Sequence, residues 1–159
     1  VKILNPGVGV GGYCIAMDPW YLIDAAPDCA LLTESARRLN IRKTEWVIQQ
    51  VRETAYAQEA KTIACLGLTY KADAADIRAS PALQIVQALE TEFSVLRVDP
   101  FVPETSNLSH ALSHADLIVS LVPHTAFSCI RQKNLQNKTI LDFAGIFHEK
   151  TPDRDWHPA

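Results

Sequence analysis

Residues 62–68, Thr-Ile-Ala-Cys-Leu-Gly-Leu, form the stretch that decides the fold of this 159-residue chain. Every residue after the first is apolar or glycine, and the run has the length of a single strand. A strand that is apolar on both faces must be covered on both faces, which is typical of a parallel sheet. The chain then passes through a loop into a helical pattern, as the first part of a β-α-β unit does.

The chain beyond this stretch repeats the alternation of short strands and helices. Strands are expected at Ser94–Val98, Leu117–Val122 and Thr139–Asp142, and helices at Pro81–Glu92 and around Leu108–His114. Ser80 supplies an N-cap, followed by Pro81 at the first helical position. The series predicts a doubly wound, Rossmann-like α/β domain with a parallel sheet over residues 61–147, in which ligands bind at the carboxyl ends of the strands.

One long helix is expected before the sheet, because no glycine or proline occurs between Pro27 and Gly67. The residues that recur there at near-helical spacing are Leu31, Leu32, Ser35, Leu39, Trp46, Val47, Val51 and Ala55. About 30 helical residues extend roughly 45 Å, which is longer than a small domain is wide. We therefore expect part of the apolar stripe to pack against a second copy, in a homodimer formed through this central helix.

Four of the six glycines lie in residues 5–13, Asn-Pro-Gly-Val-Gly-Val-Gly-Gly-Tyr, which predicts a loop able to approach a ligand closely. Gly7, Gly9 and Gly12 also satisfy the dinucleotide pattern G-x-G-x-x-G. We reject that interpretation because Pro6 interrupts the passage from strand to turn. In addition, no second strand with a terminal acidic residue follows about 20 positions later.

A short helix is expected from Cys14 to Ala26, ended by Pro27, and it begins with a thiol. Asp18 lies four residues after Cys14 and shares its face. The start of a helix stabilises a thiolate, and exposed amides there can hold an oxyanion, so the pair suits covalent attack on a carbonyl. The alternative is a small buried Cys followed by an Asp18-Pro19 helix cap, and spacing alone favours that alternative.

The loop at residues 67–81, Gly-Leu-Thr-Tyr-Lys-Ala-Asp-Ala-Ala-Asp-Ile-Arg-Ala-Ser-Pro, leaves the first strand of the sheet and enters its helix. Lys71 and Arg78 bring two cations close to a helix N-terminus, which itself favours phosphate. The alternative is a solvated loop in which Asp73 and Asp76 merely pair with these cations. His124, after the third strand, could also face the ligand crevice, but a lone His at such a position is more often a surface residue or helix cap. Cys65, within the first strand, is expected in the core.

The overall composition excludes several classes of function. The formal net charge is -3, with Lys+Arg 15 and Asp+Glu 18 spread along the chain, which leaves no basic stripe for a nucleic acid. The four cysteines form no CxxC pair and show no metal-ligand spacing, so neither a metal site nor a disulfide framework is expected, and a reducing cytoplasm fits. No stretch of about 18 apolar residues indicates a membrane span.

The chain begins without Met and reaches these motifs almost at once, so we expect a fragment of a longer protein. Residues 1–60 are expected to form an active-site loop and the central dimerisation helix, residues 61–147 the α/β domain, and residues 148–159 a mobile tail.

Three features in this order resemble the UDP-glucose/GDP-mannose dehydrogenase family. They are Gly-Gly-x-Cys-x-x-x-Asp at residues 11–18, the long helix, and Gly-Leu-x-Tyr-Lys…Asp-x-Arg-x-Ser-Pro at residues 67–81. The longer run at residues 6–20, with Ala-Arg-Arg-Leu-Asn at 36–40 and Trp-Val-Ile-x-Gln-Val at 46–51, is most similar to the branch that acts on UDP-N-acetyl-D-mannosamine. The resemblance extends to about Phe147.

The resemblance implies a four-electron oxidation of a sugar C6 alcohol to the acid, with two NAD reduced per sugar. Cys14 is then the nucleophile that forms a thiohemiacetal and a thioester, and Asp18 assists proton transfer and hydrolysis. The implied contacts to a UDP-sugar are Gly9, Gly11, Gly12, Tyr13, Tyr70, Lys71 and Arg78. NAD is expected to be bound mainly by an N-terminal domain that this chain lacks.

The chain departs from the family pattern at three positions. Tyr13 stands where His is usual, Ala72 where Pro is usual, and Ala144 where a basic residue is usual. Because ring stereochemistry and the N-acetyl group are read by loop and N-terminal residues that a single sequence does not assign, UDP-glucose and UDP-N-acetylglucosamine stay open as alternative substrates. So does a UDP-sugar-binding or dimer-forming module without catalysis, although the presence of both Cys14 and Asp18 argues against it.

Overall fold

A four-stranded parallel sheet forms the centre of the molecule in a computed structural model that describes residues 6–130, 135 and 138–147. Its strands are β1 (Thr62–Leu66), β2 (Ser94–Val98), β3 (Leu117–Ser120) and β4 (Thr139–Asp142), in the order β2-β1-β3-β4. The predicted doubly wound α/β fold is confirmed. β1 and β3 end earlier than expected. Gly67 leaves the extended conformation with a φ of +94°, and the amides of Leu121 and Val122 both donate to the carbonyl of Leu66, at 2.9 and 3.2 Å.

Both faces of the sheet are covered, as the apolar strands require. Along β1, Ile63 and Cys65 join a core with α3 (Pro81–Leu89), whereas Ala64 and Leu66 join one with α4 (Leu108–His114). This alternation sends neighbouring side chains to opposite faces, and all four residues from Ile63 to Leu66 are buried. Burial raises the pKa of the Cys65 thiol to about 12, which fits the predicted core position.

Helix α3 begins where the sequence predicts. Ser80 adopts an extended backbone, and its hydroxyl accepts a hydrogen bond from the amide of Leu83 at 3.3 Å. The same hydroxyl donates to the carbonyl of Leu68 at 2.7 Å, so the cap also holds the loop that leaves β1. Two orphan backbone groups are thus satisfied by one side chain.

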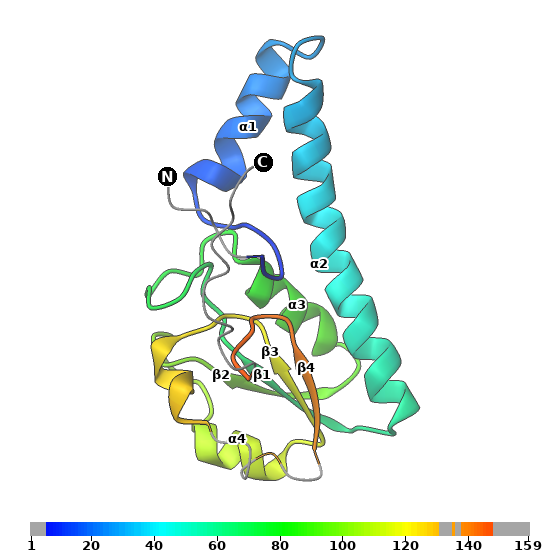
Figure 1. Ribbon diagram of the computed structural model, residues 1–159, viewed down its shortest axis with the longest axis vertical. Coiled ribbons are helices and arrows are strands. Elements are labelled where there is room, and N and C mark those ends of the chain that lie inside the picture. Colours follow the sequence, from blue (N-terminus) through cyan, green and yellow to red (C-terminus); the bar gives the residue numbers. More distant parts are fainter. Residues whose placement is uncertain (1–5, 131–134, 136–137, 148–159) are drawn as a thin grey trace, which may run out of the picture.

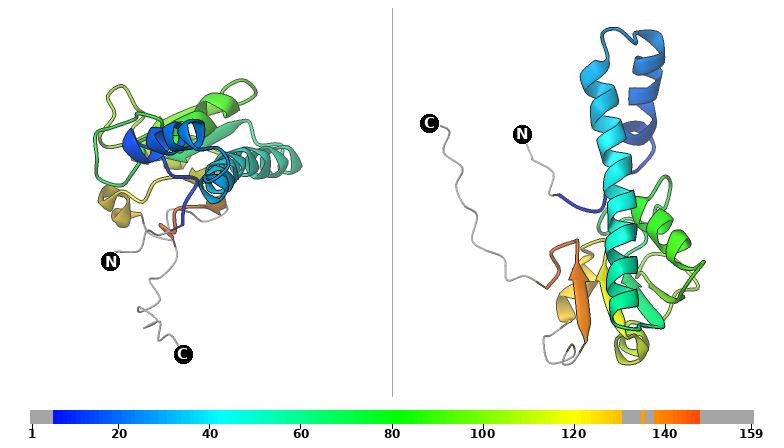
Figure 2. Two further views of the ribbon diagram at one scale, coloured as in Figure 1. Left: turned by 90° about the horizontal axis from the view of Figure 1, so that it is seen from above. Right: turned by 90° about the vertical axis from the view of Figure 1, so that its right-hand side faces the viewer.

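The long helix α2 (Leu31–Ala57) has 27 residues and so extends about 40 Å. Its second half packs on the sheet domain through Val47, Val51 and Ala55, which are fully buried. Its first half projects beyond that domain and lies beside α1 (Cys14–Ala25), with which it forms a helical hairpin (Figures 1 and 2). Within the described part of the chain, no helix is long and apolar enough to cross a membrane.

The segment before α1 crosses the space between the hairpin and the sheet domain (Figure 2, right). Val8 is buried there and belongs to the core that contains Leu68 and Val122. The glycine segment, residues 6–13, is therefore part of the packed structure at the carboxyl ends of β1 and β3. The tail predicted at residues 148–159 lies outside the described residues.

Candidate functional site

Helix α1 places the thiol and the carboxylate on one face. Cys14 is the first residue of the helix and Asp18 follows one turn later, and both side chains are exposed. They line an open groove whose other walls are Ile15, Pro19 and Leu22 of α1 and Thr33 of α2. The groove is largely apolar, so a reacting carbonyl would meet a nucleophile and a proton acceptor on an otherwise apolar wall.

The alternative helix cap at Asp18 is wrong. The helix begins at Cys14, because the glycine segment ends at Tyr13, and Pro19 lies inside the helix. Proline has no amide hydrogen to donate to the carbonyl one turn earlier, which here is that of Ile15. Asp18 therefore has no capping role, and its carboxylate faces the groove beside Cys14.

Helix α2 holds the glycine segment from one side. The Asn40 amide accepts a hydrogen bond from the amide of Val10 at 2.7 Å and donates to the carbonyl of Val10 at 3.1 Å. One turn later, the Thr44 hydroxyl donates to the carbonyl of Val8 at 3.1 Å. Sequence reasoning did not single out Asn40 or Thr44, although two hydrogen-bonding side chains one turn apart on a helix are a recognisable signal.

The loop at residues 67–81 holds the glycine segment from the other side. Gly12 donates its amide hydrogen to the carbonyl of Arg78 at 3.2 Å. A Cβ at Gly11 would collide with the Ala79 carbonyl and lie 2.7 Å from Pro81, and one at Gly12, where φ is +90°, would lie 3.0 Å from the Tyr70 ring. Both glycines are therefore required for the close approach of the glycine segment to the loop at residues 67–81. Their contact with substrate stays a prediction.

The cations of this loop have different surroundings. The Arg78 guanidinium donates to both oxygens of Asp76, with Nη2–Oδ2 at 2.7 Å, and this hydrogen bonding lowers the pKa of Asp76 to about 2. Of the two ion pairs expected in a solvated loop, the one between Asp76 and Arg78 is therefore confirmed. Asp73 does not pair with Lys71: its carboxylate accepts hydrogen bonds from Thr125, which lower its pKa. Lys71 is exposed, with Nζ 5.4 Å from the centre of the Tyr70 ring.

The two candidate sites meet at Tyr13. Tyr13 immediately precedes Cys14, and the Arg78 guanidinium lies 5.7 Å from the centre of its ring. The glycine segment thus connects the thiol on α1 with the cationic loop at the sheet edge. Among the residues at the departures from the family pattern, Ala72 packs against the core and Ala144 donates its amide hydrogen to the Ser120 hydroxyl at 3.2 Å.

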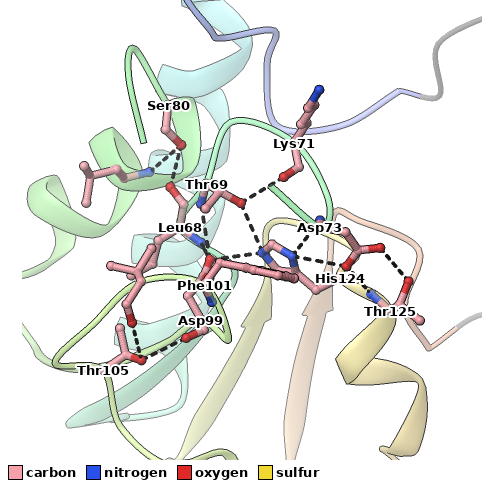
Figure 3. Close-up of polar contacts among 12 residues, drawn as sticks. Leu68, Thr69, Lys71, Asp73, Ser80, Asp99, Phe101, Thr105, His124 and Thr125 are labelled. Carbon is pink, nitrogen blue, oxygen red and sulfur yellow. Dashed lines mark hydrogen bonds and ion pairs between the residues drawn. The ribbon is translucent and has the colours of Figure 1, made fainter. Parts of the chain in front are cut away.

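The prediction that His124 is a surface residue is wrong. His124 does occupy the N-cap position of a short 3-10 helix at Thr125–Cys129, but its side chain makes no capping hydrogen bond. Its side chain is fully buried, and it lies at the centre of a polar cluster at the carboxyl ends of β1, β2 and β3 (Figure 3). Nε2 lies 3.0 Å from the Asp99 carboxylate, and Nδ1 accepts from the amide of Asp73 at 3.0 Å. Asp99 was not singled out from the sequence, although an acidic residue directly after a strand of a parallel sheet marks the ligand-binding edge.

Burial alone raises the pKa of the Asp99 carboxyl, but its hydrogen bonds outweigh that effect. The carboxylate accepts from His124, from the amide of Leu68 at 2.6 Å and from the amide of Phe101 at 2.8 Å, and its pKa is held below the usual value. Among residues 6–130, 135 and 138–147, no group of three or more His, Cys, Asp or Glu side chains could hold a metal ion.

Residues 64–149 match the UDP-glucose/GDP-mannose dehydrogenase family, UDP binding domain. The chain belongs to the UDP-glucose/GDP-mannose dehydrogenase family. It is 40% identical to an NDP-N-acetyl-D-galactosaminuronic acid dehydrogenase from Ralstonia nicotianae, over 94% of this chain and 38% of that protein. It is 36% identical to the UDP-N-acetyl-D-mannosamine dehydrogenase of Escherichia coli K12, over 92% of this chain and 40% of that protein.

The fold is also found in solved structures of this family. The UDP-D-ManNAc dehydrogenase from Pyrococcus horikoshii superposes with a TM-score of 0.82 at 31% identity, over 96% of this chain and 38% of that one. The match to the UDP binding domain begins within β1 and covers the rest of the sheet. The chain thus spans about two fifths of the length of these dehydrogenases, and the resemblance to the family expected from the sequence is confirmed.

Proposed function

We propose that this chain is the central and C-terminal part of an NAD-dependent nucleotide-sugar 6-dehydrogenase that acts on a UDP-linked N-acetylhexosamine. The observation that carries the proposal is the groove lined by both Cys14 and Asp18. The glycine segment connects this groove to the loop at residues 67–81, which we call the Lys71 loop. The relatives' names contain two N-acetylated sugars, and UDP-N-acetyl-D-mannosamine is our first candidate. UDP-glucose and UDP-N-acetylglucosamine are the alternatives.

The proposed chemistry is a four-electron oxidation at the sugar C6. NAD, when bound, accepts one hydride in each of two steps, and we assign its binding mainly to a domain outside these 159 residues. After the first step, the thiolate of Cys14 adds to the C6 aldehyde and forms a thiohemiacetal. Loss of a second hydride gives a thioester, and water then cleaves its carbon–sulfur bond, which releases the acid and restores the thiol.

Asp18 supplies the proton acceptor for this sequence. Its position one turn after Cys14 in the same groove puts a carboxylate beside the carbon that reacts with the thiol. We assign it the hydroxyl proton that the thiohemiacetal loses together with the second hydride, and the proton of the hydrolytic water. Tyr13, at the junction of the groove and the Lys71 loop, and the glycines at 9, 11 and 12 then surround the sugar.

The proposed diphosphate site lies at the sheet edge, on the loop between β1 and α3. Lys71 is exposed there, and Ser80 and Pro81 start helix α3, whose N-terminal dipole favours an anion. We assign Tyr70 to the nucleotide beside it. Arg78 shares its charge with Asp76, so we assign it mainly to ordering this loop and the Tyr13 ring.

Calorimetric titration of the chain with UDP and then with NAD tests the proposal. We expect saturable UDP binding that is weakened about tenfold or more by Lys71→Ala, because one charge-assisted contact to phosphate is worth roughly 1.5–3 kcal/mol. Lys61→Ala is the matched control, since Lys61 is exposed just before β1, at the opposite edge of the sheet. NAD binding without UDP binding would overturn the domain assignment.

The departures at Tyr13, Ala72 and Ala144 favour a second candidate, a UDP-sugar-binding module without catalysis. Alkylation separates the two. A catalytic Cys14 reacts with iodoacetamide faster than the exposed Cys29 near neutral pH and is protected by UDP-sugar. Equal rates at both cysteines without protection would favour the non-catalytic module.

A further inference from the structure

The buried imidazole of His124 has no part in the proposed chemistry, yet it links its own segment to two others. It follows β3, and it contacts Asp99 after β2 and the loop after β1, at Thr69 and Asp73 (Figure 3). A fully buried polar side chain with a partner on each ring nitrogen holds its neighbours in one arrangement. The segments it joins all lie at the edge where doubly wound sheets bind ligands.

The directions of these hydrogen bonds define the state of the ring. The amide of Asp73 can only donate, so Nδ1 must carry a lone pair, and the proton of the neutral ring is on Nε2. Nε2 then donates to the Asp99 carboxylate at 3.0 Å, with the Thr69 hydroxyl oxygen as a second neighbour at 3.2 Å. Asp99 is itself held by backbone amides of Leu68 and Phe101, so the ring is anchored from the side of the core.

The other end of the network reaches the backbone on both sides of residue 72. Thr69 donates its hydroxyl hydrogen to the carbonyl of Lys71 at 2.9 Å, and His124 accepts from the amide of Asp73. Asp73 has a φ of +55°, which is uncommon for a residue other than glycine and needs surrounding contacts to persist. Its carboxylate is bound by Thr125, the residue after His124.

The backbone of this loop is therefore held by hydrogen bonds from the core, while the Lys71 side chain stays exposed to solvent. In Figure 3 the Lys71 side chain points away from the network, toward the side where the glycine segment passes. A loop ordered before the ligand arrives loses less conformational entropy on binding. We propose that His124 is a positioning residue that, through Asp73 and Thr69, holds the Lys71 loop in its ligand-binding conformation; this rests on the proposed function of Lys71.

Two conservative substitutions separate this role from simple filling of the core. The side-chain oxygen of Asn can replace Nδ1 as the acceptor for the Asp73 amide, whereas the amide nitrogen of Gln can replace Nε2 as the donor to Asp99. His124→Asn thus keeps the arm that holds the loop, and His124→Gln keeps the arm that joins the core. Asp116→Ala is the control for stability alone, since Asp116 accepts from the amides of Lys61 and Thr62 just before β1 and at its first residue.

Amide hydrogen exchange at residues 69–73 and UDP titration are measured on all four proteins. We expect exchange at Asp73 to rise about tenfold or more and UDP affinity to fall about tenfold in His124→Gln, while His124→Asn stays within about threefold of wild type. Asp116→Ala lowers thermal stability without changing either quantity. Unchanged exchange at Asp73 in His124→Gln, or equal losses in the Asn and Gln variants, would overturn the positioning role.

The two readouts also separate this inference from the proposed function. If the wild-type chain gave no response to UDP, the proposed function would fail and, with it, the role in ligand binding. The exchange data would still show whether His124 orders the loop.

Discussion

At position 11 a hydrogen atom in place of a methyl group allows two loops to touch. A Cβ on Gly11 would run into the backbone carbonyl of Ala79, and Ala79 itself has a φ of +45°, so that carbonyl has little freedom to move. Backbone cannot turn aside as the end of a flexible side chain can. Contact between the glycine segment and the Lys71 loop therefore requires glycine at position 11.

Gly11→Ala should destabilise the fold by about 1–3 kcal/mol, because overpacking forces the two loops apart. Gly7→Ala is the matched control, since nothing lies within 4 Å of a Cβ at that position. Urea denaturation of both variants measures the difference. If Gly11→Ala were as stable as Gly7→Ala, the close approach of the two loops would be wrong.

Asp99→Asn should show that a buried carboxylate supports the sheet edge only while it is ionised. Its folded pKa lies below the value of about 3.9 expected in the unfolded chain. Its stabilisation is therefore fully present above about pH 4 and is lost as the pH falls through the folded pKa. We expect the variant to be less stable by on the order of 2 kcal/mol at pH 7, from lost hydrogen bonds to a charged group.

The measurement is urea unfolding of wild type and Asp99→Asn from pH 7 down to pH 3. The difference in unfolding free energy should shrink below about pH 4. A constant difference over the whole range would mean that the charge of Asp99 contributes nothing to stability.

At the scale of elements, the glycine segment takes its shape from α2 and from the loop before α3. It is held to α2 by Asn40 and Thr44 and to the loop by the bond from Gly12 to Arg78. One helix thus packs on the sheet at one end and positions the segment before Cys14 along its middle. The rigidity of that helix is what relates the groove on α1 to the edge of the sheet.

Asn40→Ala should loosen the glycine segment while leaving α2 intact. The variant loses both hydrogen bonds to Val10, each worth about 1 kcal/mol, and alanine itself favours helix. Hydrogen exchange at the Val10 amide should rise at least tenfold with little change in helical circular dichroism. Gln49→Ala, at an exposed position of the same helix, should leave hydrogen exchange at the Val10 amide unchanged. Equal exchange in the two variants would show that the Asn40 side chain does not hold Val10.

At the scale of the whole molecule, the α1–α2 hairpin projects from the sheet domain with apolar side chains exposed. Leu31, Leu32 and Leu39 on α2 are 64%, 84% and 67% exposed. Apolar side chains at this density on one helix end are typical of a surface that is covered by another chain. The homodimer expected from the length of α2 stays a prediction, and these leucines are where it can be tested.

The double variant Leu32→Glu/Leu39→Glu should convert a dimer into a monomer. The two residues lie two turns apart on one face, so both charges would be buried in the same interface. Light scattering after size-exclusion chromatography measures the mass, and thermal unfolding checks that the monomer is folded. Glu45→Lys, at an exposed position on a different side of α2, is the control that should keep the wild-type mass. Equal masses for wild type and the double variant would exclude this face as the interface.

The sequence by itself determined the order of strands and helices, the parallel sheet and the family. Each of these features is predicted from a few neighbouring residues. The examples are the strand at 62–66, the Ser80-Pro81 cap and the motif around Cys14. Local periodicity and capping chemistry are sufficient for such elements. The helix expected from Cys14 is confirmed, whereas the Asp18-Pro19 cap that spacing alone favoured is contradicted, because α1 already includes both residues.

Only the tertiary structure decided which polar side chains are buried and what they hold. His124 is buried because Asp99, 25 residues away, and Asp73, 51 residues away, meet it at the sheet edge. Asn40 reaches a segment 30 residues away. A polar residue in a sequence shows no partner, and its burial is stable only when distant segments supply hydrogen bonds, so these roles follow from packing rather than from any local pattern.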